Sequence, residues 1–187
     1  EMPKSFDALP TKECLPEQCD QFSFYVATDG SVGIAWRDGV CVVTPMEAMY
    51  LHGLLGSNAK VICHDLKTTL HTLDSMGLPH GNFVFDTALA AYLLNPSQSD
   101  YPVSKLATTF LGITVDDGDA AGCAESLWHL RELLQEELKQ QQMESLYDEI
   151  EFPLCSVLYR MEKRGVAIDK APLAQFGDML AARIADC

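Results

Sequence analysis

The stretch QFSFYVATDGSVGIAWRDGVCVVT, residues 21–44, decides the fold, because it contains three short apolar runs separated by turn dipeptides. In the first run Phe22, Phe24 and Val26 alternate with smaller or polar neighbours, which is typical of a strand. Two Asp-Gly dipeptides separate the runs and indicate tight hairpin turns. The stretch therefore predicts an antiparallel meander of three strands. These strands are expected at residues 21–28, 32–36 and 40–44.

Beyond residue 44 short apolar runs alternate with helical patterns, which indicates parallel crossover strands. The last third of the chain is helical throughout, with a bend expected at Pro153. This order predicts an α/β fold with a ribonuclease H-like mixed sheet, flanked by helices and followed by a helical C-terminal extension. The further strands are expected at 60–63 and 82–85, and the helices at 45–55, 64–76, 86–94, 101–111, 119–142, 145–164 and from Pro172 onward.

The composition indicates a globular protein with an unusually acidic balance. The chain has 187 residues, of which 48% are hydrophobic, and 13 Lys and Arg face 27 Asp and Glu, for a net charge of −14. Proteins that hold nucleic acid tightly usually gather Lys and Arg, so we expect weak DNA binding or none by this chain alone. No apolar run is long enough to span a membrane, and no signal peptide is visible, so we expect no membrane association.

The two ends of the sequence suggest a piece of a longer protein. The first residue is Glu1 rather than Met, and the last residues continue an amphipathic pattern that includes Phe176 and Leu180. The seven cysteines are scattered and contain no CxxC pair, which argues against a zinc site. We therefore expect free, mostly packed thiols in a reducing cytoplasm.

Two segments carry a resemblance to a known family. They are FDTALAAYLLNPSQSDYPVSKLATTFLG, residues 85–112, and EIEFPLCSVLYRMEKRGVAIDKAPL, residues 149–173. Both resemble the 3′–5′ exonuclease (proofreading) domain of bacterial family A DNA polymerases (DNA polymerase I) and its junction with the polymerase domain. The resemblance implies an irregular segment or linker at 1–20, an exonuclease-like domain at 21–148, and a connecting helix with the start of the polymerase domain at 149–187.

Active members of that family cleave a 3′ nucleotide with two divalent cations such as Mg²⁺, held by carboxylates from three motifs. The positions of this chain that match the four carboxylates are Tyr25, Ala27, Thr69 and Cys123, and Asp119 matches a water-orienting tyrosine. None of the four can serve as a carboxylate ligand. The resemblance therefore implies a degenerate site, with no catalytic residue, metal or cofactor in this chain.

Nearby acids could replace the lost ligands, namely Asp29, Asp65, Asp86, Asp117 and Asp119. Asp29 precedes Gly30 in a turn, and Asp86 stands where a helix N-cap belongs, so ordinary structural roles are favoured.

Three other features could be interpreted as functional sites, but a structural role is favoured for each. The pair His64-Asp65 resembles that of HD phosphohydrolases but fits a helix start better, and His64 with His71 is too small a set for a metal site. The apolar stripe around Trp128 is interpreted as core or interface, with Leu127, Leu130, Leu133 and Leu134. Cys123 has no basic neighbour that would activate its thiol.

The favoured function is a catalytically inactive exonuclease-like domain that supports the polymerase domain of the same chain in bacterial DNA replication and repair. DNA would then be reached through the parent protein, in the cytoplasm. Two alternatives stay open: an active metal-dependent 3′–5′ exonuclease with displaced carboxylates, and a protein-interaction module that uses the acidic surface.

Overall fold

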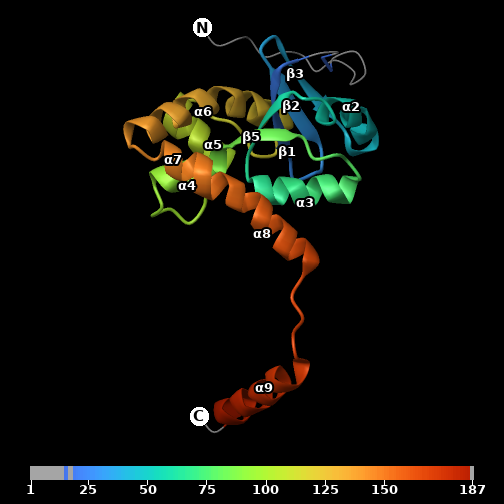
Figure 1. Cartoon of the computed structure of the whole chain (residues 1–187), viewed down its shortest axis with the longest axis vertical. Helices are drawn as coiled ribbons and strands as arrows, with labels where there is room; N and C mark the ends of the chain where they lie inside the picture. Colours follow the sequence, from blue (N-terminus) through green and yellow to red (C-terminus); the bar gives the residue numbers. More distant parts are fainter. Residues whose placement is uncertain (1–14, 17–18, 186–187) are drawn as a thin grey trace.

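The computed structural model describes residues 15–16 and 19–185, and its centre is one five-stranded mixed sheet (Figure 1). The strand order is β3-β2-β1-β4-β5; the β1–β2 and β2–β3 pairs are antiparallel, whereas β1–β4 and β4–β5 are parallel. The predicted meander followed by parallel crossover strands is confirmed. The strands are β1 (Gln21–Val26), β2 (Val32–Trp36), β3 (Gly39–Val43), β4 (Lys60–Cys63) and β5 (Asn82–Asp86). The predicted irregular segment 1–20 lies largely outside the described residues.

Helices flank both faces of the sheet and then continue beyond it. They are η1 (Pro45–Tyr50), α2 (Leu51–Leu55), α3 (Leu66–Met76), α4 (Thr87–Leu94), α5 (Val103–Leu106), η2 (Ala107–Leu111), α6 (Ala120–Gln140), α7 (Glu144–Leu146), η3 (Tyr147–Glu151), α8 (Phe152–Arg164) and α9 (Lys170–Ala185). The helix expected at 45–55 begins as a 3₁₀ helix, and the one expected at 101–111 ends in a π turn. The π turn η3 ends two residues before Pro153, whose missing N–H cannot continue regular α-helical bonding.

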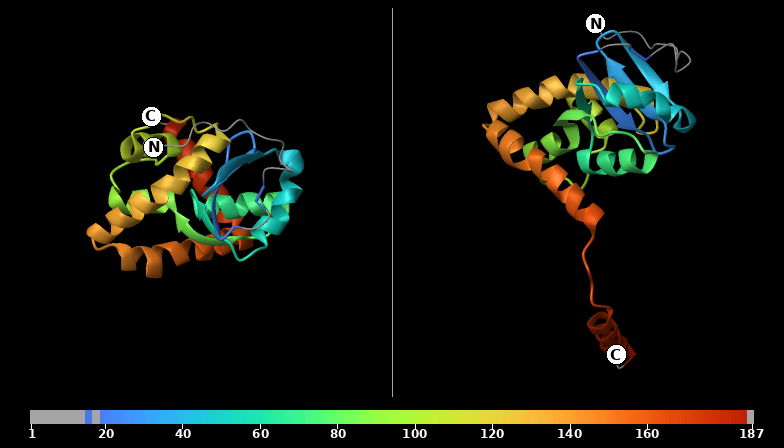
Figure 2. Two further views of the ribbon diagram at one scale, coloured as in Figure 1. Left: turned by 90° about the horizontal axis from the view of Figure 1, so that it is seen from above. Right: turned by 45° about the vertical axis from the view of Figure 1, so that its right-hand side comes forward.

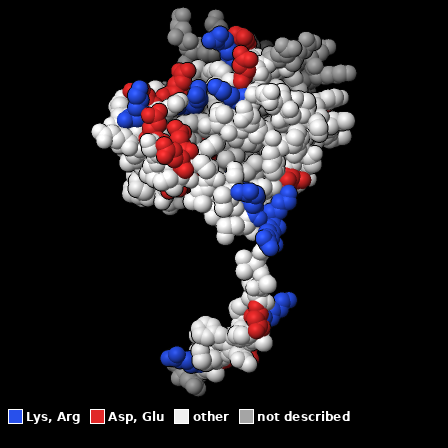
Figure 3. Space-filling view, in the orientation of Figure 1, with Lys and Arg blue, Asp and Glu red and all other residues white. Residues whose placement is uncertain are grey.

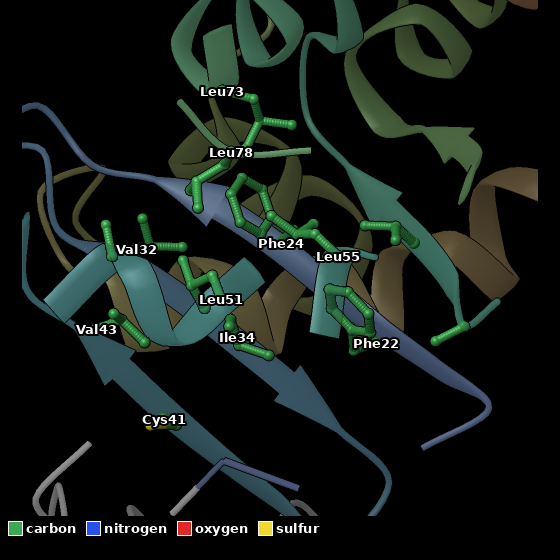
Figure 4. Packing of buried hydrophobic residues seen from close by; sticks show 13 residues of the cluster. Phe22, Phe24, Val32, Ile34, Cys41, Val43, Leu51, Leu55, Leu73 and Leu78 are labelled. Carbon is green, nitrogen blue, oxygen red and sulfur yellow. The ribbon is translucent and has the colours of Figure 1, made fainter. Parts of the chain in front are cut away.

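One face of the sheet carries large apolar side chains. Phe22 and Phe24 of β1 and Ile34 of β2 pack with Leu51 and Leu55 of α2 (Figure 4). Alternation along a strand sends every second side chain to the same face, so the Phe-x-Phe spacing of β1 produces this packing. Leu73 of α3 closes the same cluster.

The opposite face carries small residues where α6 crosses it. A Cβ placed on Gly33 would lie 1.7 Å from the Ala120 carbonyl oxygen, and Ser23 Oγ donates a hydrogen bond of 2.6 Å to the Ala124 carbonyl. The start of α6 therefore lies directly against β1 and β2. This close approach brings the first turn of α6 beside Tyr25, on the same face of β1 as Ser23.

The C-terminal helices leave the body of the molecule. α8 packs along α3, and after an extended segment α9 stands apart with its whole length exposed (Figures 1 and 2). No helix among the described residues is long and apolar enough to cross a membrane. The prediction of free thiols is confirmed for Cys19, Cys63, Cys123 and Cys155 but is wrong for Cys41, which is disulfide-bonded. Sequence spacing alone cannot reveal such pairing, because it depends on which segments the fold brings together.

Candidate functional site

Three of the four positions matched to carboxylates line one hollow. Tyr25 and Ala27, at the end of β1, and Thr69, in the first turns of α3, border a space of about 320 Å³. The two elements meet there because β4, which leads into α3, pairs in parallel with β1. His64 and Asp65, at the β4–α3 junction, border the same hollow.

The fourth position, Cys123, reaches this place from α6. Cys123 and Tyr25 belong to the same apolar cluster, and their polar atoms bind the successive carbonyl groups of Asp116 and Asp117. Tyr25, Ala27, Thr69 and Cys123 therefore converge in space although three separate elements supply them.

The polar groups at these positions donate hydrogen bonds to backbone carbonyls. Tyr25 Oη donates to Asp117 O at 3.0 Å, and Cys123 Sγ donates to Asp116 O at 3.3 Å. Thr69 Oγ1 donates to His64 O at 3.3 Å. A divalent cation needs oxygen atoms that offer lone pairs and negative charge, whereas these groups direct protons outward to their partners.

The same side chains stay uncharged at neutral pH. Burial raises the pKa of Tyr25 and raises the pKa of the Cys123 thiol to about 12. A protonated thiol is a poor nucleophile and a poor metal ligand. The site therefore has neither a resident negative charge nor an activated sulfur at these positions.

His64 adds no charge to the hollow. Its Nδ1 lies 2.9 Å from Thr87 Oγ1. Burial lowers the pKa of its imidazole, although the nearby carboxylates of Asp86 and Asp65 act to raise it. Its ring centroid lies 6.3 Å from that of Tyr25. We assign His64 a packing role between β4 and α4.

Two of the candidate replacement acids are held in local turns and caps. Asp29 Oδ1 accepts hydrogen bonds from the Ser31 backbone N–H and hydroxyl, at 2.8 and 2.6 Å. Asp65 adopts a left-handed conformation and caps α3, accepting from the Thr68 backbone at 3.1 Å and its hydroxyl at 2.7 Å. The prediction that Asp29 forms a turn and that His64-Asp65 begins a helix is confirmed.

Asp86 is the most heavily bonded acid of the chain's described part. Its Oδ1 accepts from the backbone of Asp65 and Ala88 at 2.9 Å each, and Oδ2 accepts from Leu66 N at 2.8 Å. The predicted N-cap of the helix that follows it is confirmed, and the same carboxylate also holds the start of α3. Burial raises its pKa, while the backbone N–H donors oppose that shift.

The last two candidates accept hydrogen bonds from helix starts. Asp117 accepts from the Ser104 backbone at 3.0 Å and from its hydroxyl at 2.6 Å, and Asp119 caps α6 through Gly122 N. Within the described residues no group of three or more His, Cys, Asp and Glu side chains is arranged to hold a metal ion. Each candidate acid thus has a structural use that a metal would have to displace.

The remaining sequence features fall in different places. His71 pairs with Glu162 of α8 rather than with His64. Within the stripe of α6, Leu127, Leu130 and Leu134 are buried, but Leu133 is 41% exposed and Trp128 only partly covered.

Sequence reasoning missed a polar network between α3 and α8, centred on Tyr159. Its hydroxyl donates to the Asp74 carboxylate, which also pairs with Lys163 at 2.6 Å, while Glu162 pairs with Lys67 at 2.9 Å. The partners lie about ninety residues apart, so no local pattern reveals them. The i, i+3 and i, i+4 placement of Tyr159, Glu162 and Lys163 on one helix face was the only available signal.

Searches of known proteins show what the chain resembles. No family model matches it. It is 29% identical over 192 residues to the DNA polymerase I of Mycobacterium bovis, covering 89% of this chain and 21% of that protein. It is 30% identical over 202 residues to the DNA polymerase I of Geobacillus stearothermophilus, covering 95% of this chain and 23% of that one. The chain thus spans about a fifth of the length of the curated relatives it matches.

Solved structures agree with this resemblance. The polymerase structure of Pol1 from M. smegmatis, in complex with a DNA primer-template and dNTP, superposes with a TM-score of 0.71 and 26% identity over 89% of this chain and 31% of that one. NrnC of Brucella melitensis superposes with a TM-score of 0.64 over 84% of this chain and 91% of its own, and its 17% identity shows the fold alone. The ribonuclease H-like fold and the resemblance to DNA polymerase I are confirmed.

Proposed function

We propose that this relative of DNA polymerase I is an exonuclease-like domain that has lost 3′–5′ exonuclease chemistry and supports a polymerase domain in the same protein. The observation that carries the proposal is the convergence of Tyr25, Ala27, Thr69 and Cys123 at one hollow. Sequence matching assigned these positions to carboxylates from three separate motifs. That the fold brings them together supports the matching, and with it the loss of all four ligands.

The chemistry of the hollow supports the loss of metal binding. Two-metal hydrolysis needs carboxylates to hold the cations that activate water and stabilise the leaving oxygen. Tyr25, Thr69 and Cys123 instead donate hydrogen bonds to carbonyl groups, and Ala27 has no polar atom at all. Without cations the rate would fall by many orders of magnitude.

Displaced carboxylates offer a weaker explanation. Asp29 and Asp119 each accept bonds from their own turn or helix start, and Asp117 accepts bonds from Ser104 at the start of α5. Asp65 borders the hollow, but both of its carboxylate oxygens accept hydrogen bonds from Thr68. Asp86 would have to release several backbone N–H groups to bind a cation.

The structural role is supported by apolar surface at the C-terminal end. Of the 18 exposed large hydrophobic side chains among the described residues, 12 lie between Ile150 and Ile184. α8 packs on α3 through Tyr159 and Cys155, yet its outer side exposes a stripe that includes Val157 and Met161. A helix that is apolar on two sides is normally covered on both. We propose that the polymerase domain covers this outer stripe.

The remaining parts of the proposal follow from charge and relatedness. The protein would act in the cytoplasm in DNA replication or repair. It would reach DNA through its polymerase domain, since the net charge of −14 disfavours strong binding by this chain alone. We divide the chain at about residue 149, inside the π turn η3 that leads into α8.

The decisive experiment is a nuclease assay on the purified 187-residue chain. A 5′-labelled single-stranded oligonucleotide is incubated with the chain and Mg²⁺ or Mn²⁺, beside an active proofreading polymerase as positive control. We expect no shortening from the 3′ end. Metal-dependent digestion that copurifies with the chain and disappears in a Tyr25→Ala/Asp65→Asn variant would overturn the proposal in favour of displaced ligands.

A further inference from the structure

The outer face of α8 carries an apolar stripe. Four side chains recur there at intervals of three or four residues and are between 39% and 58% exposed: Leu154, Val157, Leu158 and Met161. Residues at this spacing share one side of a helix. Tyr159, on the other side, is buried in the cluster that includes residues of α3. The outer stripe therefore faces away from the body of the chain.

Two arginines border this outer stripe along one edge. Arg160 and Arg164 are exposed and follow Val157 by three and seven residues. Because each residue advances an α-helix by about 100°, both arginines lie within about 60° of Val157, on the side away from Leu158. A single surface of α8 thus contains the apolar side chains and both guanidinium groups.

Neither guanidinium group has an acidic partner within the described residues. The ion pairs there include neither Arg160 nor Arg164, whereas Lys163 on the inner side pairs with Asp74. The Arg160 Nε donates to the Ser156 carbonyl of its own helix, at 3.3 Å. No Asp or Glu lies three or four residues from either arginine. The two guanidinium groups instead neighbour each other at a spacing where like charges are unfavourable.

The helix dipole explains only part of this basic charge. Cations in the last turn of a helix are favourable, which accounts for Lys163 and Arg164. Arg160 lies about one turn earlier, where the effect has largely faded. Figure 3 shows basic side chains gathered near the end of α8, although the whole chain has a net charge of −14.

An apolar stripe with a basic edge fits a protein surface better than a nucleic acid. A nucleic-acid backbone would neutralise the arginines but would leave the apolar side chains facing phosphate and water. Protein interfaces combine an apolar centre with a polar rim, and arginine is enriched in them. Its planar guanidinium group binds a carboxylate through two parallel hydrogen bonds.

We propose that α8 docks on the polymerase domain of the same protein through an apolar surface edged by Asp or Glu, whose carboxylates pair with Arg160 and Arg164. This inference rests on the proposed function, which assigns the outer stripe to that domain. Burial of the stripe drives the contact. The ion pairs set its register, because a shifted arrangement would leave guanidinium groups in the interface without partners.

Thermal melting of the full-length protein that contains this chain tests the acidic edge. Arg160→Glu with Arg164→Glu should lower its midpoint temperature by at least about 2 °C, because carboxylates then face carboxylates. The isolated 187-residue chain, whose stripe is already exposed, should melt nearly unchanged with the same substitutions. The matched control, Arg37→Glu with Lys139→Glu, reverses the same charge at exposed positions on the β2–β3 turn and α6. It should leave both midpoints unchanged.

Cross-linking identifies the partner carboxylates. Arg160→Lys with Arg164→Lys keeps the charge and supplies amines that a carbodiimide joins to carboxylates in contact with them. Peptide mapping of the treated full-length protein should recover amide-linked peptides that join α8 to the polymerase domain. Sodium chloride at about 1 M should lower their yield, since it shortens electrostatic attraction to about 3 Å.

The possible failures of the inference and of the proposed function give different results. If Val157→Lys with Met161→Lys lowers the full-length midpoint but the arginine reversal does not, the stripe is covered and the acidic edge is wrong. If neither lowers it, the polymerase domain does not cover α8 and the inference fails, while the nuclease assay still decides whether exonuclease activity is lost.

Two further outcomes would assign the arginines to another partner. A loss of affinity for duplex DNA in the arginine-reversal variant, without a lower midpoint temperature, would assign them to nucleic acid. Cross-links that join isotope-labelled to unlabelled copies of the protein, with none to the polymerase domain of the same copy, would assign them to self-association. Either result overturns the proposal.

Discussion

Tyr25 illustrates how a metal-binding position can become a structural one without disturbing the fold. Its ring packs against the cluster around α6, and its hydroxyl bridges β1 to the Asp117 carbonyl in the loop before α6. Cys123 makes a similar bond to Asp116, so the two side chains bind successive carbonyl groups of this loop. In place of repelling carboxylates that require cations, the site has neutral groups whose bonds need none.

Restoring the four carboxylates tests this interpretation directly. A variant with Tyr25→Asp, Ala27→Glu, Thr69→Asp and Cys123→Asp should melt below the unaltered chain in EDTA, because like charges are then crowded together. Mn²⁺ should raise its melting temperature. When the metal concentration is a hundredfold above the dissociation constant, the unfolding free energy should rise by about 2.7 kcal/mol. Thermal melts with and without Mn²⁺ measure both effects.

The control for this experiment adds four aspartates at exposed positions remote from the hollow, namely Met46, Ser97, Thr109 and Gln141. Neither this control nor the unaltered chain should gain stability from Mn²⁺. A comparable gain in the control would mean that the metal responds to added charge in general. No gain in the restored variant would mean that these positions do not form a metal site.

At the scale of elements, the contact of α6 with the sheet depends on Gly33. Gly33→Ala would place a methyl group into the Ala120 carbonyl, and helix or sheet must shift to admit it. We expect a loss of at least about 1–3 kcal/mol in unfolding free energy, the usual cost of overpacking. Gly53→Ala, where no atom lies within 4 Å of the added Cβ, should instead gain up to about 1 kcal/mol. Chemical denaturation measures both, and equal effects would contradict the close packing.

The α3–α8 contact should weaken in acid. The Lys163 ammonium and Tyr159 hydroxyl hold the pKa of Asp74 below the ordinary value for Asp, and Lys67 holds the pKa of Glu162 below the ordinary value for Glu. A carboxyl whose folded pKa is lowered contributes stability above its unfolded pKa, and that stability is lost as pH falls through the folded value. Melting temperature should therefore decline below about pH 4. Asp74→Asn with Glu162→Gln should flatten this decline. If the melting temperature of the variant falls with pH as steeply as that of the unaltered chain, these ion pairs are not the cause.

The sequence predicted elements better than it predicted their contacts. The strands and most helices follow from local periodicity and turn dipeptides, and Asp86 was recognised as an N-cap from its position alone. The same carboxylate also binds the backbone of Asp65 and Leu66, which only the pairing of β4 with β5 brings near. The four vacated site positions came from family resemblance. The Tyr159 network joins distant segments and had no local pattern.

The whole molecule is electrically uneven. Acidic side chains gather where α6 and α7 meet, and basic ones gather near the end of α8 (Figure 3). Arg160, Lys163 and Arg164 supply positive charge in the last turns of α8, which suits the negative end of a helix dipole. The net charge of −14 therefore understates the local contrast, and the basic side chains at the end of α8 lie on the same helix as its exposed apolar stripe.

This stripe gives a prediction that separates the chain's own stability from its proposed support of a polymerase domain. Val157 and Met161 are 39% and 58% exposed, so Val157→Lys with Met161→Lys should leave the melting temperature of the chain nearly unchanged and reduce its binding of an apolar fluorescent dye. In a chimera that joins the chain to the polymerase part of the Geobacillus relative, the same change should cost about 1–3 kcal/mol, because it buries unpaired charge. Leu133→Lys with Leu146→Lys, at comparably exposed apolar positions on α6 and α7, is the matched control and should cost the chimera nothing extra. Equal losses for both pairs in the chimera would mean that the polymerase domain does not cover α8.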